Sequence, residues 1–293
     1  MGTAAGIIDL HTHSTASDGS FSPAELAWHA KRQGLSAFAL TDHDIILGND
    51  EAAKAAAEAG VDFIPGMELT VDYLGRPIHV VSLGFDAGHP AFREMYRGIR
   101  RQKEDGIQAL VDGIRARGVD ITMKKVLAMA NEPLDYYDVM RYLVSLHLDL
   151  KGKSAWEVYI EPVLAEIGCN KNAEPRQAFA AIHAAGGVTS LAHFHKRLGL
   201  KGLSREEQAS AIRELHAMGL DGMEYWYPSY TEEDRAFVAS MIDELGLMAT
   251  GGTDFHGIHR PGIEMGTGRD GNLAIPAEAL VDIKARIARY HAR

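Results

Sequence analysis

The chain has 293 residues, of which 46% are hydrophobic and 24% are charged, and its formal net charge is −10. These proportions are ordinary for a globular chain with a sizeable core, and the acidic balance argues against an extended nucleic-acid surface built on general basicity. The single cysteine, Cys169, excludes an internal disulfide framework; since no apolar run approaches the roughly 18 residues of a membrane span and no signal-peptide pattern is present, we expect a cytoplasmic protein without membrane contact.

Alternating strands and helices are predicted along the first 89 residues. One helix has clear start signals, because Ser22 is placed as its N-cap, Pro23 takes its first turn and Glu25 completes a capping box. Short apolar or β-branched runs between turn residues predict the strands. The predicted order is a strand at 6–8, a helix at 22–33, a strand at 37–41, a helix at 49–59, and strands at 62–64 and 77–85.

Residues 90–168 differ, because they show helical periodicity and charge-rich faces without a convincing strand. We interpret this span as a helical insertion, and as a candidate lid, within a catalytic domain formed by 1–89 and 169–293. Beyond it the alternation resumes, which gives roughly seven βα units and an irregular α/β barrel. The later elements are predicted as a helix at 175–185, a strand at 188–192, a helix at 204–218, a strand at 222–226, a helix at 232–245, a strand at 247–249 and a helix at 276–292.

The segment after the first predicted strand carries the most specific motif of the chain. His11 and His13 are two residues apart, so a continuing strand would project both imidazoles from the same face. Asp18 offers a carboxylate from the turn that follows. Two imidazoles that converge at the end of a strand form half of a metal site.

Other apolar segments of the chain also contain, or end in, His, Asp or Glu. A lone histidine in a strand is more often a satisfied core residue, but the repetition of this pattern is hard to explain by independent accidents. Because the strand ends of a βα barrel open onto one face, we predict that these side chains form a polynuclear metal site. The residues are His43, Glu68, His79, His193, Asp254 and His256.

The motifs over residues 9–256, taken in order, resemble those of the PHP (polymerase and histidinol phosphatase) superfamily. They are His-x-His with a trailing Asp, Thr-Asp-His, Gly-x-Glu, a strand His, Ala-His and Gly-Thr-Asp-x-His. The chain is most similar to stand-alone PHP phosphoesterases, which include nucleoside 3′,5′-bisphosphate phosphatases and oligonucleotide-trimming enzymes. The resemblance implies a distorted (β/α)7 barrel with a helical insertion. It also implies two to three divalent metal ions, commonly Mn, Fe or Zn.

The resemblance further implies a ligand set and a mechanism. Glu68 would bridge two metals, and Glu68, Asp254, His43 and His193 would be the catalytic residues. A water held between two metals loses a proton near neutral pH and attacks phosphorus in line, while the metals neutralise the phosphoryl oxygens. The implied groups are His11, His13, Glu68 and Asp254 for the first metal, Glu68, His79 and His193 for the second, and Asp18, His43 and His256 for the third.

Side chains around this core are expected to support the ligands and to choose the substrate. Three acids are candidates to accept the other ring N–H of a ligating histidine, although strand-end polarity explains them equally well. Two cations are candidates for a non-reacting phosphate, one tyrosine for stacking on a base or sugar, one arginine of the insertion for substrate, and two histidines for protonation of the leaving group. The acids are Asp9, Asp42 and Asp44, and the cations for the phosphate are Lys196 and Arg197. The tyrosine is Tyr227, the arginine of the insertion is Arg141, and the histidines for the leaving group are His195 and His259.

Several functions stay open at this point. The leading one is a metal-dependent phosphoesterase that acts on a small phosphorylated nucleotide or sugar, including a cyclic phosphodiester that is opened and then hydrolysed to phosphate. A nucleoside 3′,5′-bisphosphate phosphatase and an oligonucleotide-trimming exonuclease are alternatives of the same class. A C–N amidohydrolase and a non-catalytic metal-binding module are alternatives of other classes. The expected partner is a small phosphate ester, and the oligomeric state is left open.

Overall fold

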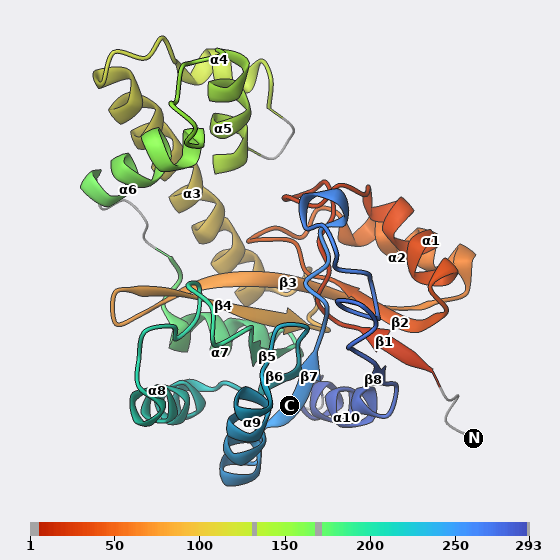
Figure 1. Ribbon diagram of the computed structural model, residues 1–293. Helices are drawn as coiled ribbons and strands as arrows, with labels where there is room; N and C mark the ends of the chain where they lie inside the picture. The colour runs from red at the N-terminus through yellow and green to blue at the C-terminus, as the bar shows by residue number, and fades with distance from the viewer. Residues whose placement is uncertain (1–5, 131–133, 168–171, 292–293) are drawn as a thin grey trace. The chain divides into compact units, whose positions relative to one another are not determined.

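The computed structural model describes residues 6–130, 134–167 and 172–291, so Cys169 lies outside the described residues (Figure 1). The chain divides into two compact units, one formed by Met1–Met95 with Ala173–Arg293 and the other by Tyr96–Asn172. The domain boundaries expected from the sequence, 90–168 within 1–89 and 169–293, stay a prediction. No described helix is both long enough and apolar enough to cross a membrane.

The first unit is built on an eight-stranded sheet with the order β7-β6-β5-β4-β3-β2-β1-β8. Neighbouring strands are parallel from β1 to β3 and from β5 to β7, whereas β4 is antiparallel to both β3 and β5 and β8 is antiparallel to β1. The strands are β1 (Ile7–Asp9), β2 (Leu35–Leu40), β3 (Asp62–Tyr73), β4 (Arg76–Leu83), β5 (Val188–Leu191), β6 (Gly222–Trp226), β7 (Met248–Gly251) and β8 (Ile275–Pro276).

The chain segments after β1 and β7 join the two ends of this sheet. Leu10 donates its N–H to the Gly251 carbonyl at 3.2 Å, and the Asp254 N–H reaches the His11 carbonyl at 2.8 Å. This approach requires a glycine at position 252, because a Cβ there would lie 2.2 Å from the Cβ of His11. The strands therefore form a nearly closed barrel, which confirms the distorted α/β barrel expected from the sequence.

The hairpin β3–β4 departs from the predicted pattern. The predicted strand at 62–64 runs on through Pro65 and Gly66 to Tyr73, and turns back at Leu74 and Gly75, which both have positive φ. A two-residue turn of this kind matches the twist of antiparallel strands. The register pairs Thr70 with His79, so Glu68, two residues before Thr70, lies on the same face as His79.

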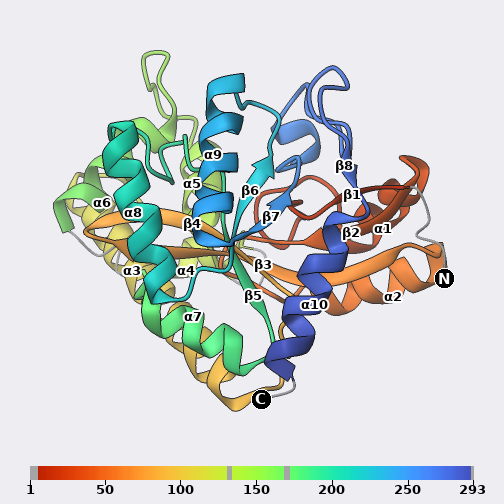
Figure 2. The same ribbon diagram turned by 90° about the horizontal axis from the view of Figure 1, so that it is seen from below.

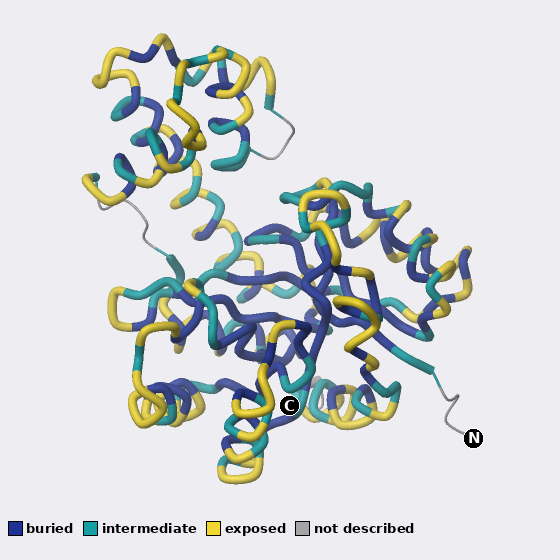
Figure 3. Tube along the Cα trace, in the orientation of Figure 1, coloured by how far each residue is buried: buried dark blue, intermediate teal, exposed yellow. Residues whose placement is uncertain are grey.

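Helices surround the strands of this unit (Figure 2). The capping box of Ser22 and Glu25 is present as predicted, and Gly60 ends the second helix with a left-handed φ of 70°. Buried residues concentrate in the strands (Figure 3). A hydrophobic cluster joins strand residues such as Ile8, Val188 and Met248 to Leu280 and Ile283 of the last helix. The helices are α1 (Pro23–Arg32), α2 (Asn49–Ala59), α7 (Pro175–Ala184), α8 (Arg205–Met218), α9 (Glu232–Leu245) and α10 (Ala279–His291), with a short 3-10 turn at Gly257–His259.

The second unit consists of helices and connecting turns over its described residues, with no strand among them. It has a hydrophobic core of its own, which includes Leu110, Val139 and Val163. Its role as a lid stays a prediction. Its elements are most of α3 (Pro90–Ala116), α4 (Met123–Leu127), α5 (Tyr136–Ser145), a π-helical turn at Trp156–Ile160 and α6 (Glu161–Ile167).

Candidate metal centre

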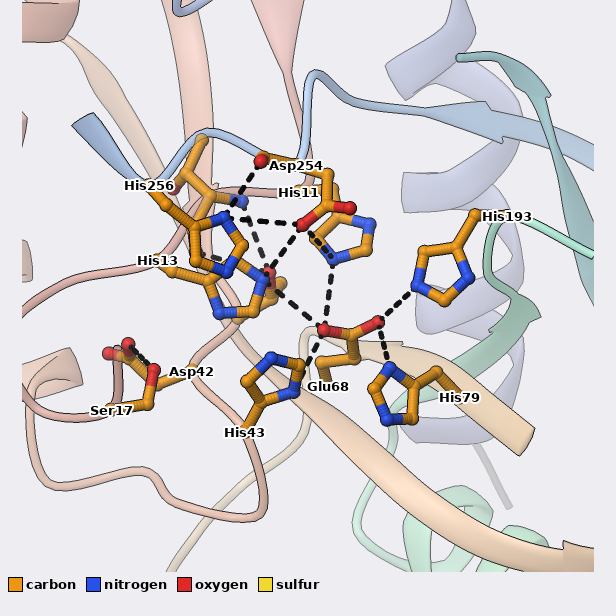
Figure 4. Close-up of polar contacts among 12 residues, drawn as sticks. His11, His13, Ser17, Asp42, His43, Glu68, His79, His193, Asp254 and His256 are labelled. Carbon is orange, nitrogen blue, oxygen red and sulfur yellow. Dashed lines mark hydrogen bonds and ion pairs between the residues drawn. The ribbon is translucent and has the colours of Figure 1, made fainter. Parts of the chain in front are cut away.

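Glu68 lies at the centre of a group of histidines (Figure 4). Its side chain is fully buried on β3, and its two carboxylate oxygens face different imidazoles. Oε1 lies 2.8 Å from both His79 Nδ1 and His193 Nε2. Oε2 lies 3.2 Å from the Nε2 atoms of His11 and His13 and 3.0 Å from His43 Nδ1. One carboxylate thus connects two sets of nitrogen atoms.

Asp254 approaches the same group from the segment after β7. Its Oδ1 lies 3.7 Å from His11 Nε2, 3.4 Å from His13 Nε2 and 3.4 Å from His256 Nδ1. The backbone of Asp254 has a φ of 56°, and that of His193 a φ of 24°. Such left-handed conformations are costly for residues other than glycine, and they concentrate at functional sites.

Asp18 brings a third carboxylate to the site, on the Nδ1 side of the His13 ring. Its Oδ2 lies 3.2 Å from His256 Nε2 and 3.7 Å from His43 Nε2, and its Oδ1 lies 3.6 Å from His13 Nδ1. The ring of His13 stacks on that of His256 at 4.1 Å and lies 4.5 Å from that of His43. The three rings are therefore held around one carboxylate.

The potential ligand atoms fall into three groups, within each of which all atoms lie within 4.8 Å of one another. The first has the composition that the resemblance implies. The second contains Glu68 and His79 with His43 in place of the implied His193, although His193 Nε2 lies 2.8 Å from Glu68 Oε1. In the third, His13 joins the three implied residues. The groups are His11, His13, Glu68 and Asp254; His43, Glu68 and His79; and His13, Asp18, His43 and His256.

Orphaned polar atoms show that this set fits divalent cations. Nε2 of His11, both ring nitrogens of His13 and Oε2 of Glu68 are buried and have no hydrogen-bond partner among the described residues. Buried polar atoms are normally paired, and imidazole with carboxylate suits borderline divalent metals. The site thus combines buried nitrogen and oxygen atoms that lack hydrogen-bond partners with the negative charge of its carboxylates.

The electrostatics of the group agree with cation binding. Burial lowers the pKa of His13, but its close contacts with the carboxylates of Asp254 and Glu68 outweigh burial and raise that pKa to about 10. Burial raises the pKa of Glu68, but the charges of His79 and His11 hold it well below its usual range. The site therefore attracts positive charge, and a metal would compete with protons for the same nitrogen atoms.

Glu224, on β6, supports two of these histidines and was missed by the sequence reasoning. Its Oε1 accepts a hydrogen bond from His11 Nδ1 at 2.6 Å, and its Oε2 accepts one from the His193 backbone N–H at 2.6 Å. In the neutral form of the ring this bond fixes the proton on Nδ1, so that Nε2, which faces Glu68, is the nitrogen that can bind a metal. A signal was available, because Glu224 is the only charged residue of β6, as Glu68 is among its apolar neighbours.

The acids expected to bind ring N–H groups mostly have other partners. Asp9 accepts hydrogen bonds from the Thr253 N–H and hydroxyl and from the Gly266 N–H, which ties the two sides of the barrel closure together. Asp42 accepts from Ser14 and Ser17, and so shapes the loop between His13 and Asp18 (Figure 4). Asp44 accepts from the Thr70 N–H and hydroxyl. The expected carboxylate–histidine contact is therefore made by Glu224.

Asp254 also has donors on its outer oxygen, Oδ2. The Tyr227 hydroxyl donates to it at 2.6 Å, Lys196 Nζ lies 3.4 Å away, and Arg260 forms an ion pair with it. Tyr227 is fully buried, so the contact found for it is with a potential ligand, and its expected role in stacking stays a prediction. Sequence reasoning missed Arg260, because an arginine in a polar loop carries no special signal.

The remaining candidates for substrate lie outside the ligand groups. His195 bonds Ser229 Oγ at 2.9 Å, and burial lowers its pKa to about 4, so its ring is neutral near pH 7. His259 contacts the Asp18 carbonyl at 2.8 Å, and Arg197 is exposed. Arg141 belongs to the second unit, where it pairs with Asp138. Their expected roles stay predictions.

A nearly closed α/β barrel with a buried His/Asp/Glu cluster at its strand ends has the architecture of a metal-dependent enzyme. The sequence pattern described for the PHP domain matches residues 9–216. The chain belongs to the PHP domain family, as its motifs predict.

Several relatives cover most of the chain. The 5′-3′ exoribonuclease of Haemophilus influenzae is 34% identical over 85% of this chain and 89% of its own length. The 3′,5′-nucleoside bisphosphate phosphatase of Chromobacterium violaceum is 29% identical over 90% and 92%. The phosphoribosyl 1,2-cyclic phosphate 1,2-diphosphodiesterase of Eggerthella lenta is 25% identical over 86% and 94%.

A solved structure from Bifidobacterium adolescentis, whose description names a metal-dependent phosphoesterase, matches with a TM-score of 0.78. It is 26% identical, and the match covers 98% of both chains. Together, the family, these relatives and the cluster of potential ligands make the chain a metal-dependent phosphoric ester hydrolase.

Proposed function

We propose that this enzyme hydrolyses phosphate esters of small nucleotides or phosphorylated sugars at a site for three divalent metal ions. The observation that carries the proposal is the position of Glu68, whose two oxygens face separate sets of imidazoles. A carboxylate in this position suits a bridge between two cations. The third ion would be held by Asp18, His43, His256 and His13.

The bound ions would supply an activated water and positive charge for the phosphoryl oxygens. The chain itself supplies the ligands and their orientation. Glu224 fixes the tautomer of His11, and Lys196 and Arg260 place two cationic groups beside the single outer oxygen of Asp254. This surplus of positive charge at the edge of the cluster favours an anionic substrate. Lys196 is the better candidate for contact with it, since its Nζ lies 3.4 Å from Asp254 Oδ2 and so makes only a long contact there.

The relatives support a phosphorylated nucleotide or pentose as the substrate class. Their names share phosphoryl groups on ribose, either as a monoester, as a cyclic diester or within RNA. We propose removal of phosphate from a monoester as the principal reaction, with opening of a cyclic diester as a preceding step. The second candidate is stepwise trimming of short RNA from the 5′ end, which the Haemophilus influenzae relative supports. The net charge of −10 argues for short rather than extended RNA.

The test is release of phosphate by the manganese-loaded protein, with the metal content of the same sample counted. The substrates would be a nucleoside 3′,5′-bisphosphate, a cyclic phosphodiester of a pentose, a 5′-phosphorylated oligoribonucleotide, an aryl phosphate and histidinol phosphate. The proposal predicts turnover of the bisphosphate or of the cyclic compound well above that of the aryl phosphate and histidinol phosphate, and none by a Glu68→Gln control. A fully loaded protein that releases no phosphate from the ribose compounds would overturn the proposed substrate class.

A further inference from the structure

The two oxygens of the Asp254 carboxylate face different groups of side chains. Oδ1 faces the imidazoles of His11 and His13, at 3.7 and 3.4 Å. Oδ2 faces away from these rings, toward hydroxyl, guanidinium and ammonium donors. Hydrogen bonds to the second oxygen orient a carboxylate that binds a metal through the first.

Arg260 and Tyr227 form a closed set of contacts around this outer oxygen. Arg260 Nη2 donates to the Tyr227 hydroxyl at 2.8 Å, and that hydroxyl donates to Asp254 Oδ2 at 2.6 Å. Arg260 Nη1 pairs with the same carboxylate and also donates to the Asp254 backbone carbonyl at 2.9 Å. The guanidinium thus holds both the side chain and the strained backbone of Asp254, whose φ is 56°.

Lys196 is placed differently. Its Nζ lies 3.4 Å from Oδ2 and 4.8 Å from the centre of the Tyr227 ring, and its side chain is about a third exposed (32%). An ammonium group with one long contact retains donors for a ligand, whereas both terminal nitrogens of Arg260 are already used within the protein. Of the two cations beside Asp254, Lys196 therefore makes the fewer contacts, whereas Arg260, whose side chain is 26% exposed, is engaged with both Asp254 and Tyr227.

We propose that Arg260 and Tyr227 are positioning residues that hold the Asp254 carboxylate so that Oδ1 alone faces the metals. The kinetic consequence rests on the proposed function, but the consequence for metal binding does not. Loss of either group lets the carboxylate turn, which weakens metal binding by His11, His13, Glu68 and Asp254. Because the contacts of Arg260 are with Asp254 and Tyr227, we expect KM to change little while kcat falls.

The experiment is a titration of the metal-free protein with Mn²⁺, with bound metal counted and the fold checked by circular dichroism. The variants are Arg260→Met, Arg260→Lys, Tyr227→Phe and Arg260→Met with Tyr227→Phe. Arg205→Met is the matched control, because Arg205 also pairs with an aspartate and lies over aromatic rings, those of Phe194 and Phe237, but its aspartate, Asp234, is not a candidate ligand. Tyr227→Phe removes one hydroxyl, so it keeps the test valid if Arg260→Met does not fold.

The proposal predicts that Arg260→Met and Tyr227→Phe each weaken the tightest Mn²⁺ binding by about 10-fold or more, as for other groups that orient ligands. The double variant loses little beyond the larger single effect, Arg260→Lys recovers part of the affinity, and Arg205→Met binds as the wild type does. Wild-type Mn²⁺ affinity in folded Arg260→Met and Tyr227→Phe, or a KM raised 10-fold with unchanged metal affinity, would overturn it. Weakened metal binding in a protein whose wild type releases no phosphate would instead overturn the proposed function alone.

Discussion

Replacement of Glu224 by glutamine tests how much the histidine ligands depend on the group behind them. Glu224 is 1% exposed and accepts two hydrogen bonds of 2.6 Å, one from the His11 ring and one from the His193 backbone. Glutamine keeps the size of the side chain, but its single carbonyl oxygen can satisfy only one of these donors, and its amide group meets the other. The change therefore disturbs His11, a potential ligand, and His193, which contacts Glu68, without creating a cavity.

The charge of Glu224 also matters. Burial lowers the pKa of His11, but Glu68, Glu224 and Asp254 outweigh it and raise that pKa well above its usual value. Removal of one carboxylate charge makes the His11 ring less basic, and so a poorer ligand. Groups that orient ligands are worth about 10- to 100-fold in metal affinity, which corresponds to about 1.4–2.7 kcal/mol. We expect Mn²⁺ binding to weaken by that factor.

The assay is a Mn²⁺ titration of Glu224→Gln beside Glu214→Gln. Glu214 is an exposed residue of α8 that accepts one hydrogen bond, from the Tyr73 hydroxyl, at 2.7 Å. The control thus loses the same charge and a comparable contact away from the cluster. If Glu224→Gln is folded and binds Mn²⁺ as tightly as Glu214→Gln does, the argument that Glu224 prepares His11 for a metal is wrong.

Three other changes have defined outcomes. Glu68→Gln should keep the barrel folded but abolish turnover, because both of its oxygens face potential metal sites; an unchanged kcat in a folded, metal-depleted variant would contradict this. Lys196→Ala should raise KM for a doubly phosphorylated substrate much more than for an aryl phosphate, whereas equal effects on both would remove its assigned role. Asp221→Asn should reduce the free energy of unfolding at pH 7 by about 1–3 kcal/mol, because Asp221 accepts hydrogen bonds from His183 and Tyr290. Burial raises the Asp221 pKa, but its contacts with His183 outweigh this and lower it, so its contribution is present above the unfolded pKa of about 4 and is lost as the pH falls through the folded value. Urea unfolding should therefore show the difference shrinking in acid, and a constant difference would refute it.

The local signals of the sequence were sufficient for most of the barrel. Caps and glycines marked the helices, as at Ser22 and Gly60, because those positions satisfy backbone groups within a few residues. The length of β3 was underestimated, because Pro65 and Gly66 resemble a strand end. The turn at Leu74 and Gly75 was also missed, since leucine seldom adopts a positive φ and the pair lacks the Asn-Gly pattern of such turns.

The candidate ligands and the groups that orient them differ in how visible they are in a sequence. A ligand such as Glu68 or His79 places a polar group inside an apolar strand, where its cost requires an explanation. Glu224 has the same signal, but its partner His11 is 213 residues away, and only the closed barrel brings them together. Arg260 lies in a polar loop, and its contact with Tyr227 depends on the path of that loop. The types of the potential ligands are therefore visible in the sequence, whereas their orientation depends on distances that only folding creates.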